Sequence, residues 1–365
     1  MPNFILSTCG TSLFTNGISS ELRKEFFQHT NQKTWEDIHL DIALRLKQHA
    51  QQQEAQLLVA DSASVRRMSA ELNSLLAWYD KNIPNVQDVH LLLATDTALG
   101  KATAEIIQKW LQAQGYTVFI FSSAGLNTAS FQSFRESLSD LTANLIEQVT
   151  SYKENGYQIL FNLTGGFKAL NGFLQALSTI YADQTIYLFE SSTEFLTIPK
   201  LPFKLDAEGI IIEHMHSLRR LSEGLSISQK ERLSIPDTLL FFIDDEVTLS
   251  EWGTLLWKSC YKTLYKTKLW PSISERIIFS SDFEQSTKDL DSQILQIVNQ
   301  RIAELASYAE NDCKYALKSL DPKPLQEKKY KEQNLWECDL DPHYRIFMKK
   351  EGFVFTLQYV SKALH

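Results

Sequence analysis

Short apolar runs that alternate with longer helical segments most constrain how the first half of this chain can fold. Each run is apolar without alternating polarity, which indicates a strand buried on both faces of a sheet. The runs are Phe4–Ser7, Leu57–Ala60, Val89–Ala94, Thr117–Ser122, Gln158–Asn162 and Thr185–Glu190. The pattern predicts a Rossmann-like parallel α/β domain over residues 1–204, with helices on both faces.

Four loops that follow predicted strands are rich in glycine and hydroxyl side chains. Ligands of open parallel sheets bind beyond the carboxyl ends of the strands, where such loops meet. Glycines let backbone N–H groups approach an anion, and hydroxyls donate hydrogen bonds, so the loops favour a phosphate-bearing ligand. For any single loop, a simple tight turn is the alternative. The residues expected to bind the ligand are Cys9, Gly10, Thr11, Ser12, Thr95, Asp96, Thr97, Gly125, Leu126, Asn127, Thr164, Gly165, Gly166 and Lys168.

Lys168 is the sharpest single candidate in these loops. Its flexible ammonium group follows two glycines and can reach a phosphate as a point charge, although an ordinary exposed helix lysine is the alternative. The chain contains neither G-x-G-x-x-G nor G-x-x-x-x-G-K-[ST], which argues against NAD binding and ATP hydrolysis.

Composition and charge exclude several classes of protein. No apolar run approaches the roughly 20 residues that span a bilayer, and the start resembles a first strand more than a signal peptide, so we expect a cytoplasmic protein without membrane contact. The four cysteines lack a C-x-x-C pair, which disfavours a zinc site and a disulfide framework. A net charge of -8 argues against a broad nucleic-acid groove, so any RNA contact must be local.

The second half divides into two further predicted segments. Residues 205–272 form a helical connector, with an extended stretch at Gly209–Glu213 and a winged-helix-like fold as one interpretation. Residues 273–365 form a small α+β domain with an antiparallel sheet. Its predicted elements are a strand at Arg276–Phe279, helices at Phe283–Asn299 and Arg301–Leu320, and strands at Leu335–Asp339, Tyr344–Lys349 and Phe353–Val360.

Arg345 is the most informative basic residue of this last segment. It lies between apolar residues of a strand that we expect to be central, where an unpaired guanidinium is costly and needs a defined partner. Because side chains alternate along a strand, His343 shares its face, and the two could converge on a phosphate. An ion pair with a neighbour such as Asp339 is the alternative.

The first half resembles a CRISPR-associated Rossmann-fold (CARF) domain through Cys9–Ser12, Thr95–Thr97 and Thr164–Lys168, over roughly the first 200 residues. The resemblance implies a homodimer that binds one cyclic oligoadenylate on its two-fold axis, with cyclic tetra-adenylate as the activating ligand and no further cofactor. A four-membered ring has the even symmetry that suits a two-fold contact, and a six-membered ring is the alternative. Slow cleavage of that ligand by Thr11, Ser12 and Lys168 is a further implication.

The last segment resembles the RelE family of mRNA-cleaving toxins through Trp336–Leu340, His343–Phe347 and Tyr359–Lys362. The resemblance implies a metal-independent endoribonuclease that cuts mRNA on the ribosome, with Arg345 stabilising the scissile phosphate. The family's second arginine is lacking here, which leaves the assignment of acid and base open. The catalytic candidates are Arg345, Lys329, Lys331, His343, Lys362 and His365.

Together the two resemblances predict a ligand-activated ribonuclease of CRISPR defence. Two alternatives remain: a ligand-responsive transcriptional regulator that contacts DNA through the connector, and a ring nuclease that only degrades cyclic oligoadenylate.

Overall fold

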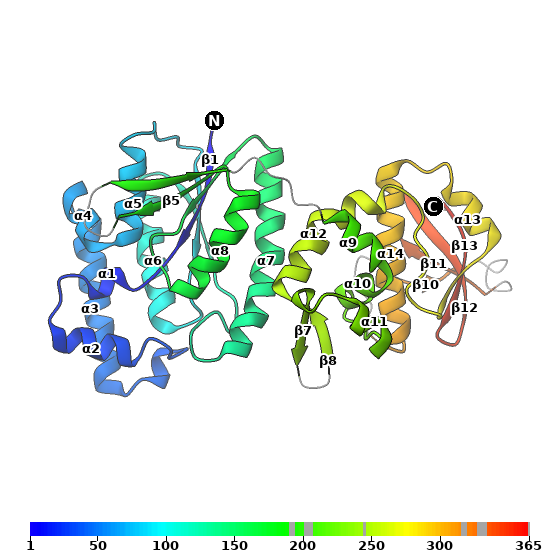
Figure 1. Ribbon diagram of the computed structural model, residues 1–365, viewed down its shortest axis with the longest axis horizontal. Helices are drawn as coiled ribbons and strands as arrows, with labels where there is room; N and C mark the ends of the chain where they lie inside the picture. Colours follow the sequence, from blue (N-terminus) through cyan, green and yellow to red (C-terminus); the bar gives the residue numbers. More distant parts are fainter. Residues whose placement is uncertain (190–193, 201–206, 244–245, 315–319, 327–333, 364–365) are drawn as a thin grey trace. The chain divides into compact units, whose positions relative to one another are not determined.

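The computed structural model describes residues 1–189, 194–200, 207–243, 246–314, 320–326 and 334–363 (Figure 1). The chain divides into two compact units, Met1–Leu205 and Asp206–His365. The second unit therefore contains both the predicted connector and the predicted RelE-like segment. Within the described residues, no helix is long and apolar enough to cross a membrane.

A six-stranded sheet forms the centre of the first unit. Its order is β3-β2-β1-β4-β5-β6, which is the strand order of a doubly wound Rossmann sheet. Strands β1 to β5 are parallel, whereas β6 runs antiparallel to β5. The predicted parallel sheet is thus confirmed. The strands are β1 (Asn3–Thr8), β2 (Val89–Leu93), β3 (Thr117–Phe121), β4 (Gln158–Asn162), β5 (Gln184–Leu188) and β6 (Phe195–Pro199).

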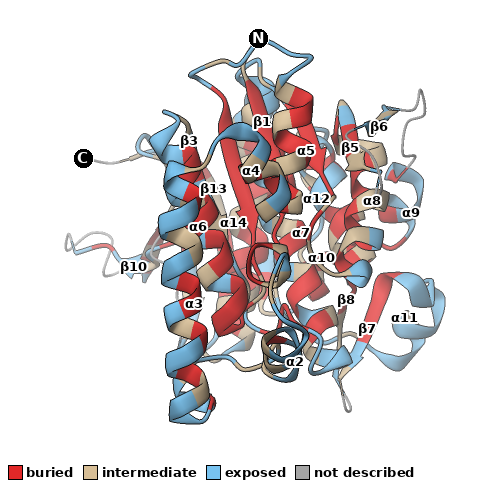
Figure 2. Ribbon diagram, turned by 90° about the vertical axis from the view of Figure 1, so that its left-hand side faces the viewer, coloured by how far each residue is buried: buried red, intermediate tan, exposed pale blue. Residues whose placement is uncertain are grey.

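Helices cover both faces of this sheet, which explains why β1 is buried at every position (Figure 2). Ile5 belongs to a core with Leu46 and Leu75 from helices on one face. Its neighbour Phe4 stacks on Tyr152 of α7, with ring centroids 4.3 Å apart. The helices are α1 (Ser12–Thr15), α2 (Ser20–Gln28), α3 (Leu40–Val59), α4 (Ser62–Met68), α5 (Ala70–Tyr79), α6 (Ala98–Ala113), α7 (Phe131–Glu154) and α8 (Lys168–Tyr181), with a 3-10 turn at Trp35–Asp37.

The strand predicted at Leu57–Ala60 is wrong, because this run is the end of helix α3. Leu57 is buried on the same face of the helix as Leu46 and Ala50, while Leu58 and Val59 are exposed. A four-residue apolar run carries too little periodicity to distinguish the end of a helix from a strand.

The second unit begins with a mainly helical part. The extended stretch predicted at Gly209–Glu213 is wrong, since α9 occupies it. The winged-helix-like interpretation stays a prediction. The elements are α9 (Glu208–Glu213), α10 (Met215–Ser222), α11 (Gln229–Ser234), a 3-10 turn at Asp237–Leu239, the hairpin β7 (Leu240–Ile243) and β8 (Glu246–Leu249), and α12 (Glu251–Tyr265).

A five-stranded sheet in the order β10-β11-β12-β13-β9 completes the second unit. Its pairings are antiparallel except for β9, which runs parallel to β13. Helix α14 packs Val298 and Ile302 against Ile346 and Leu357 of the sheet. The predicted boundary between the helices Phe283–Asn299 and Arg301–Leu320 is wrong, because α14 continues through residue 300. The elements are β9 (Ile277–Phe279), α13 (Ser281–Thr287), α14 (Ser292–Glu310), β10 (Lys323–Pro324), β11 (Leu335–Asp339), β12 (Tyr344–Glu351) and β13 (Val354–Lys362).

Candidate functional site

The strand order of the first unit reverses between β1 and β4, and the loops that follow these two strands lie against each other there. The Thr8 hydroxyl donates to the Gly165 carbonyl at 2.7 Å. A Cβ added to Gly10 would lie 2.8 Å from the Gly166 nitrogen, so only glycine permits this approach. The structure therefore brings two predicted loops together at the position where open α/β sheets bind ligands.

Glu71 of α5 joins both loops, and the sequence did not indicate it. Its carboxylate accepts the Gly10 N–H at 2.6 Å, the Ser12 hydroxyl at 2.8 Å and the Ser69 hydroxyl at 2.7 Å. Gly165 packs directly on this side chain, since a Cβ there would lie 2.1 Å from Glu71 Oε1. Two of the predicted ligand donors, in Gly10 and Ser12, thus bond to a buried carboxylate.

A second buried carboxylate, Asp96, joins the loops after β2 and β3. It accepts the Gly125 N–H at 2.7 Å and the Asn127 side-chain amide at 2.6 Å, and its own N–H donates to the Leu126 carbonyl at 3.2 Å. Next to it, Thr97 caps α6 by accepting the Gly100 N–H at 3.1 Å. The Thr97 hydroxyl also bonds to the Thr95 hydroxyl at 2.8 Å. These side chains hold the loops in place, and their contact with a ligand stays a prediction.

The loop from Leu163 to Phe167 is held by bonds on both sides. The Thr164 hydroxyl accepts the Leu188 N–H at 3.0 Å, and the Asn171 amide donates to the Gly165 carbonyl at 2.7 Å. Gly166 has φ +80°, a left-handed conformation that favours glycine. Glycine at position 166 thus allows the tight turn that was the alternative prediction for this loop.

Lys168 is the first residue of α8 and is exposed. Its ammonium group makes no hydrogen bond or ion pair with any residue that the structure describes. No side chain caps this end of α8, so the free N–H groups and the helix dipole leave partial positive charge beside the lysine. Among the predicted ligand residues, Lys168 therefore carries the positive charge that an anion can approach.

Cys9 lies beneath the same loops. Burial raises the pKa of its thiol well above the ordinary value, and the negative charge of Glu71 adds to the shift. Its N–H donates to the Leu93 carbonyl at 2.9 Å. Cys9 thus contributes a neutral, packed side chain.

In the second unit, Arg345 lies on β12, the middle strand of its sheet, as predicted. Its Nε is 2.8 Å from Asp339 Oδ1, which confirms the predicted alternative of an acidic partner. Its Nη1 donates to the carbonyls of Asp341 at 2.6 Å and Tyr344 at 2.9 Å. Among the described residues, Nη2 has no hydrogen-bond partner, so one edge of the guanidinium can still meet a phosphate.

The other catalytic candidates are only partly described. His343 is exposed in the turn before β12, and its N–H donates to Asp341 Oδ1 at 2.7 Å. Lys362 is exposed and pairs in register with Tyr344, one position from Arg345. Lys329, Lys331 and His365 lie outside the described residues.

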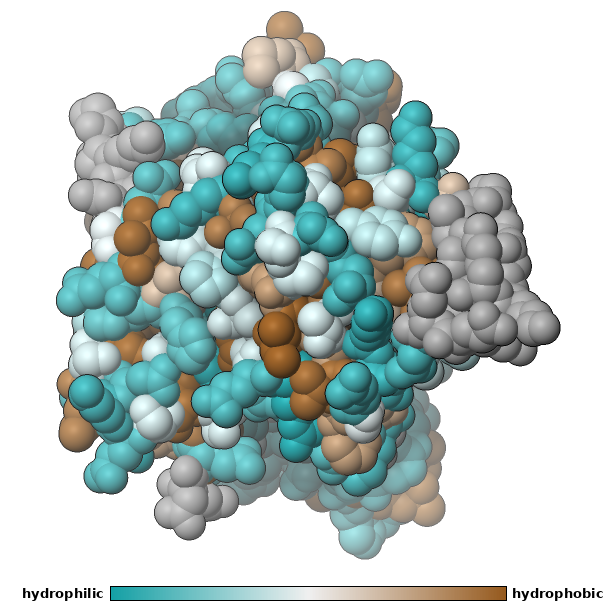
Figure 3. Space-filling view, turned by 90° about the vertical axis from the view of Figure 1, so that its right-hand side faces the viewer, coloured by the Kyte–Doolittle hydropathy of each residue, from teal (hydrophilic) through white to brown (hydrophobic). Residues whose placement is uncertain are grey.

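The surface near this sheet mixes charge with aromatic rings. Lys350 Nζ lies 4.5 Å from the ring centroid of Trp336, and the Arg276 guanidinium lies 5.4 Å from that of Phe353. On the face that Figure 3 shows, hydrophobic residues are scattered among hydrophilic ones.

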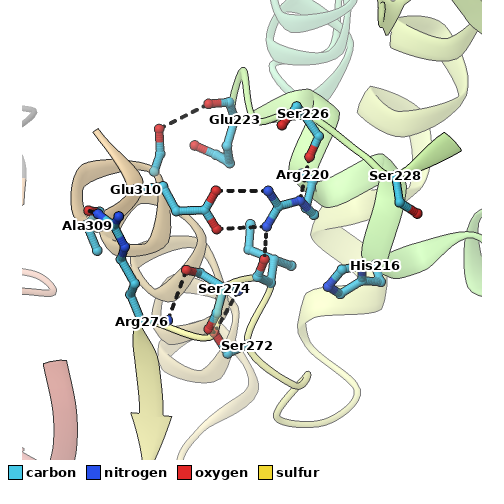
Figure 4. Close-up of polar contacts among 12 residues, drawn as sticks. His216, Arg220, Glu223, Ser226, Ser228, Ser272, Ser274, Arg276, Ala309 and Glu310 are labelled. Carbon is cyan, nitrogen blue, oxygen red and sulfur yellow. Dashed lines mark hydrogen bonds and ion pairs between the residues drawn. The ribbon is translucent and has the colours of Figure 1, made fainter. Parts of the chain in front are cut away.

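Two neighbouring arginines of α10 bond to the segment that follows residue 270, and Figure 4 shows the bonds of one of them, Arg220. Arg220 meets Glu310 of α14 through two bonds of 2.8 Å each and also donates to the Ile273 carbonyl. These bonds lower the pKa of the Glu310 carboxyl. Arg219 is fully buried and donates to the Pro271 carbonyl at 2.6 Å and the Tyr265 hydroxyl at 3.1 Å. The predicted connector and the predicted RelE-like segment thus share polar contacts.

Residues 66–201 match a family model described as CRISPR-associated protein (Cas_APE2256). This match indicates a CRISPR-associated protein. The matched range contains Glu71, Asp96 and the loop from Thr164 to Lys168, and it ends before the second unit begins.

Proposed function

We propose that the protein is a ribonuclease effector of CRISPR defence: cyclic tetra-adenylate binds the first unit and activates the second to cleave ribosome-bound mRNA, which inhibits translation. The observation that carries the proposal is the pair of loops that meet at the reversal point of a Rossmann-ordered sheet, of which the loop after β4 lies inside the range that matches a CRISPR-associated family. The protein acts in the cytoplasm.

The first unit acts as a CARF-like sensor. Lys168 and the free N–H groups of α8 offer positive charge to the phosphates of a cyclic oligoadenylate. Buried carboxylates hold the surrounding loops before the ligand arrives, so little ordering is needed on binding. In a homodimer each protomer contacts half of the ring.

The second unit acts as a RelE-like nuclease that needs no metal. Cleavage requires deprotonation of a 2′-hydroxyl, stabilisation of charge on the phosphate and protonation of the leaving oxygen. The Arg345 Nη2 edge stabilises the phosphate, while Asp339 and two carbonyls fix the guanidinium. We assign the base to Lys329 or Lys331 and the acid to His365, with His343 as a further phosphate contact and Lys362 as a further catalytic candidate.

The test incubates translating ribosomes with the protein, with and without cyclic tetra-adenylate, and maps mRNA ends. Arg345→Ala should lower ligand-saturated cleavage by about 100-fold or more, because one charged donor to a transition state contributes on that order. Lys168→Ala should raise the ligand concentration needed by about tenfold and leave saturated cleavage unchanged. Lys24→Ala, which removes an exposed helix lysine elsewhere in the unit, is the matched control.

Cleavage without ligand or without ribosomes would overturn the proposal, as would full activity of Arg345→Ala. Degradation of labelled cyclic tetra-adenylate with no mRNA cleavage would favour the ring-nuclease alternative instead.

A further inference from the structure

Glu71 is a fully buried acidic residue whose side chain points at the candidate ligand loops. Its Oε2 accepts two hydroxyls, from Ser12 and Ser69, and its Oε1 accepts the Gly10 N–H. Both serines also accept backbone N–H groups, Ser12 from Ala70 at 3.0 Å and Ser69 from Leu72 at 3.2 Å. The hydroxyl hydrogens are thereby directed at the carboxylate.

This pattern needs a group that only accepts hydrogen bonds. A carboxylate meets both hydroxyls and the amide at once, whereas a carboxamide presents NH₂ where one oxygen lies now. In one orientation, the NH₂ group of a glutamine at position 71 would point at the two serine hydroxyl hydrogens. In the other orientation, it would point at the Gly10 N–H. Either orientation leaves buried donors unpaired.

The same residue also holds the loop after β4. The Glu71 carbonyl accepts the Asn162 side-chain amide at 3.1 Å, and Asn162 ends β4. Gly165 packs on the Glu71 side chain with no space for a Cβ. One residue of α5 thus fixes the positions of the loops that follow β1 and β4.

We propose that Glu71 is a positioning residue of the ligand site, which holds the loop Cys9–Ser12 against Gly165 and Gly166 in the conformation that accepts the ligand. This inference rests on the proposed function. It gives Glu71 a role in ligand binding although Glu71 does not itself touch the ligand. Glu71 carries its negative charge close to the place where we expect phosphates. By charge alone, its removal would strengthen binding of an anion. Loss of position would weaken binding, so the two effects have opposite signs.

The test compares Glu71→Gln with Asp88→Asn in the full-length protein. Asp88 is an equally buried carboxylate at the amino edge of the same sheet, where it accepts the Asn3 N–H at 2.7 Å, the Asn3 side-chain amide at 2.9 Å and the Tyr79 hydroxyl at 3.1 Å. Titration calorimetry with cyclic tetra-adenylate gives Kd and the number of sites separately. Both substitutions should lower the melting temperature, because each removes an acceptor from buried donors.

Only Glu71→Gln should raise Kd, by about tenfold or more, with the number of sites unchanged. A purely structural role predicts that both variants lose sites or stability and keep the same Kd. Unchanged or tighter binding by Glu71→Gln would overturn the proposal, as would an equal rise in Kd for Asp88→Asn.

Hydrogen exchange of the segment 9–14 separates this inference from the proposed function. If the wild-type protein fails to bind cyclic tetra-adenylate, the proposed ligand is wrong. Faster exchange at Gly10 in Glu71→Gln than in Asp88→Asn then still supports the positioning role, and equal exchange in both variants overturns it.

Discussion

At the scale of single residues, Gly165 should tolerate no side chain. A Cβ there would lie 2.1 Å from Glu71 Oε1 and 2.6 Å from its Cδ, and the buried carboxylate cannot move without losing its bonds. Gly165→Ala should therefore cost about 2 kcal/mol or more in the free energy of unfolding, measured by urea denaturation.

Gly172→Ala provides the control for this substitution. Gly172 lies inside α8, and a Cβ there meets nothing within 4 Å. Alanine should be neutral or stabilise the helix by about 0.5–1 kcal/mol. Equal destabilisation by both substitutions would contradict the close contact with Glu71.

The sequence predicted the loops of the candidate site better than it predicted their internal bonds. Glycine-rich and hydroxyl-rich strand ends indicated where Gly10 and Gly165 would meet, because parallel strands end at one edge. Glu71 lies 61 positions from Gly10 and reads as an ordinary helix glutamate. Only the packing of α5 on the sheet makes it a partner. Likewise, the acidic neighbour of Arg345 was predictable because Asp339 lies on the adjacent strand of the same hairpin.

At the scale of elements, the errors fall where short apolar runs belong to helices. Ile210 and Ile212 resemble a strand in sequence, yet Ile211 alone is buried and α9 forms. The long strands of the second sheet were predicted from alternation of polar and apolar residues, which β13 keeps more regularly than β12, where Ile346, Phe347 and Met348 are all buried. In β12, Arg345 is followed by Ile346 on the face of the α14 core. Within the second unit, alternation therefore marked correctly predicted strands, whereas the first sheet was predicted from unbroken apolar runs, the same signal that failed at the end of α3.

The bond between α10 and α14 gives a prediction at this scale. Arg220 and Glu310 are largely buried and joined through both carboxylate oxygens, with side-chain exposures of 15% and 26%. A double-mutant cycle with Arg220→Met and Glu310→Gln should give a coupling free energy of about 1–3 kcal/mol in urea unfolding. The more exposed pair Arg276–Asp312 is the control and should give less than about 1 kcal/mol. A coupling no larger than that of the control would show that the bond does not hold the helices together.

At the scale of the whole molecule, the two units have separate hydrophobic cores. One core gathers around Ile5, Leu92 and Leu160 of the first sheet, and the other around Ile302, Ile346 and Leu357 of the second unit. The arginines of α10 bond to Pro271, Ile273 and Glu310 within the second unit, so the predicted connector is tied to helix α14 of the last segment. If the proposed activation takes place, it must then act on these two segments together.

Separate cores should give two calorimetric unfolding transitions, with Arg220→Met lowering only that of the second unit. Cyclic tetra-adenylate at 100 times its Kd should stabilise the first unit by about 2.7 kcal/mol, since a ligand of the folded state stabilises through mass action. Lys168→Ala should remove about half of this stabilisation at the same ligand concentration, because a tenfold rise in Kd leaves the ligand at only about 10 times its Kd, whereas Lys24→Ala should keep it. If the ligand raised the temperatures of both unfolding transitions equally, the stabilities of the two units would be coupled. That result would contradict two units that unfold independently.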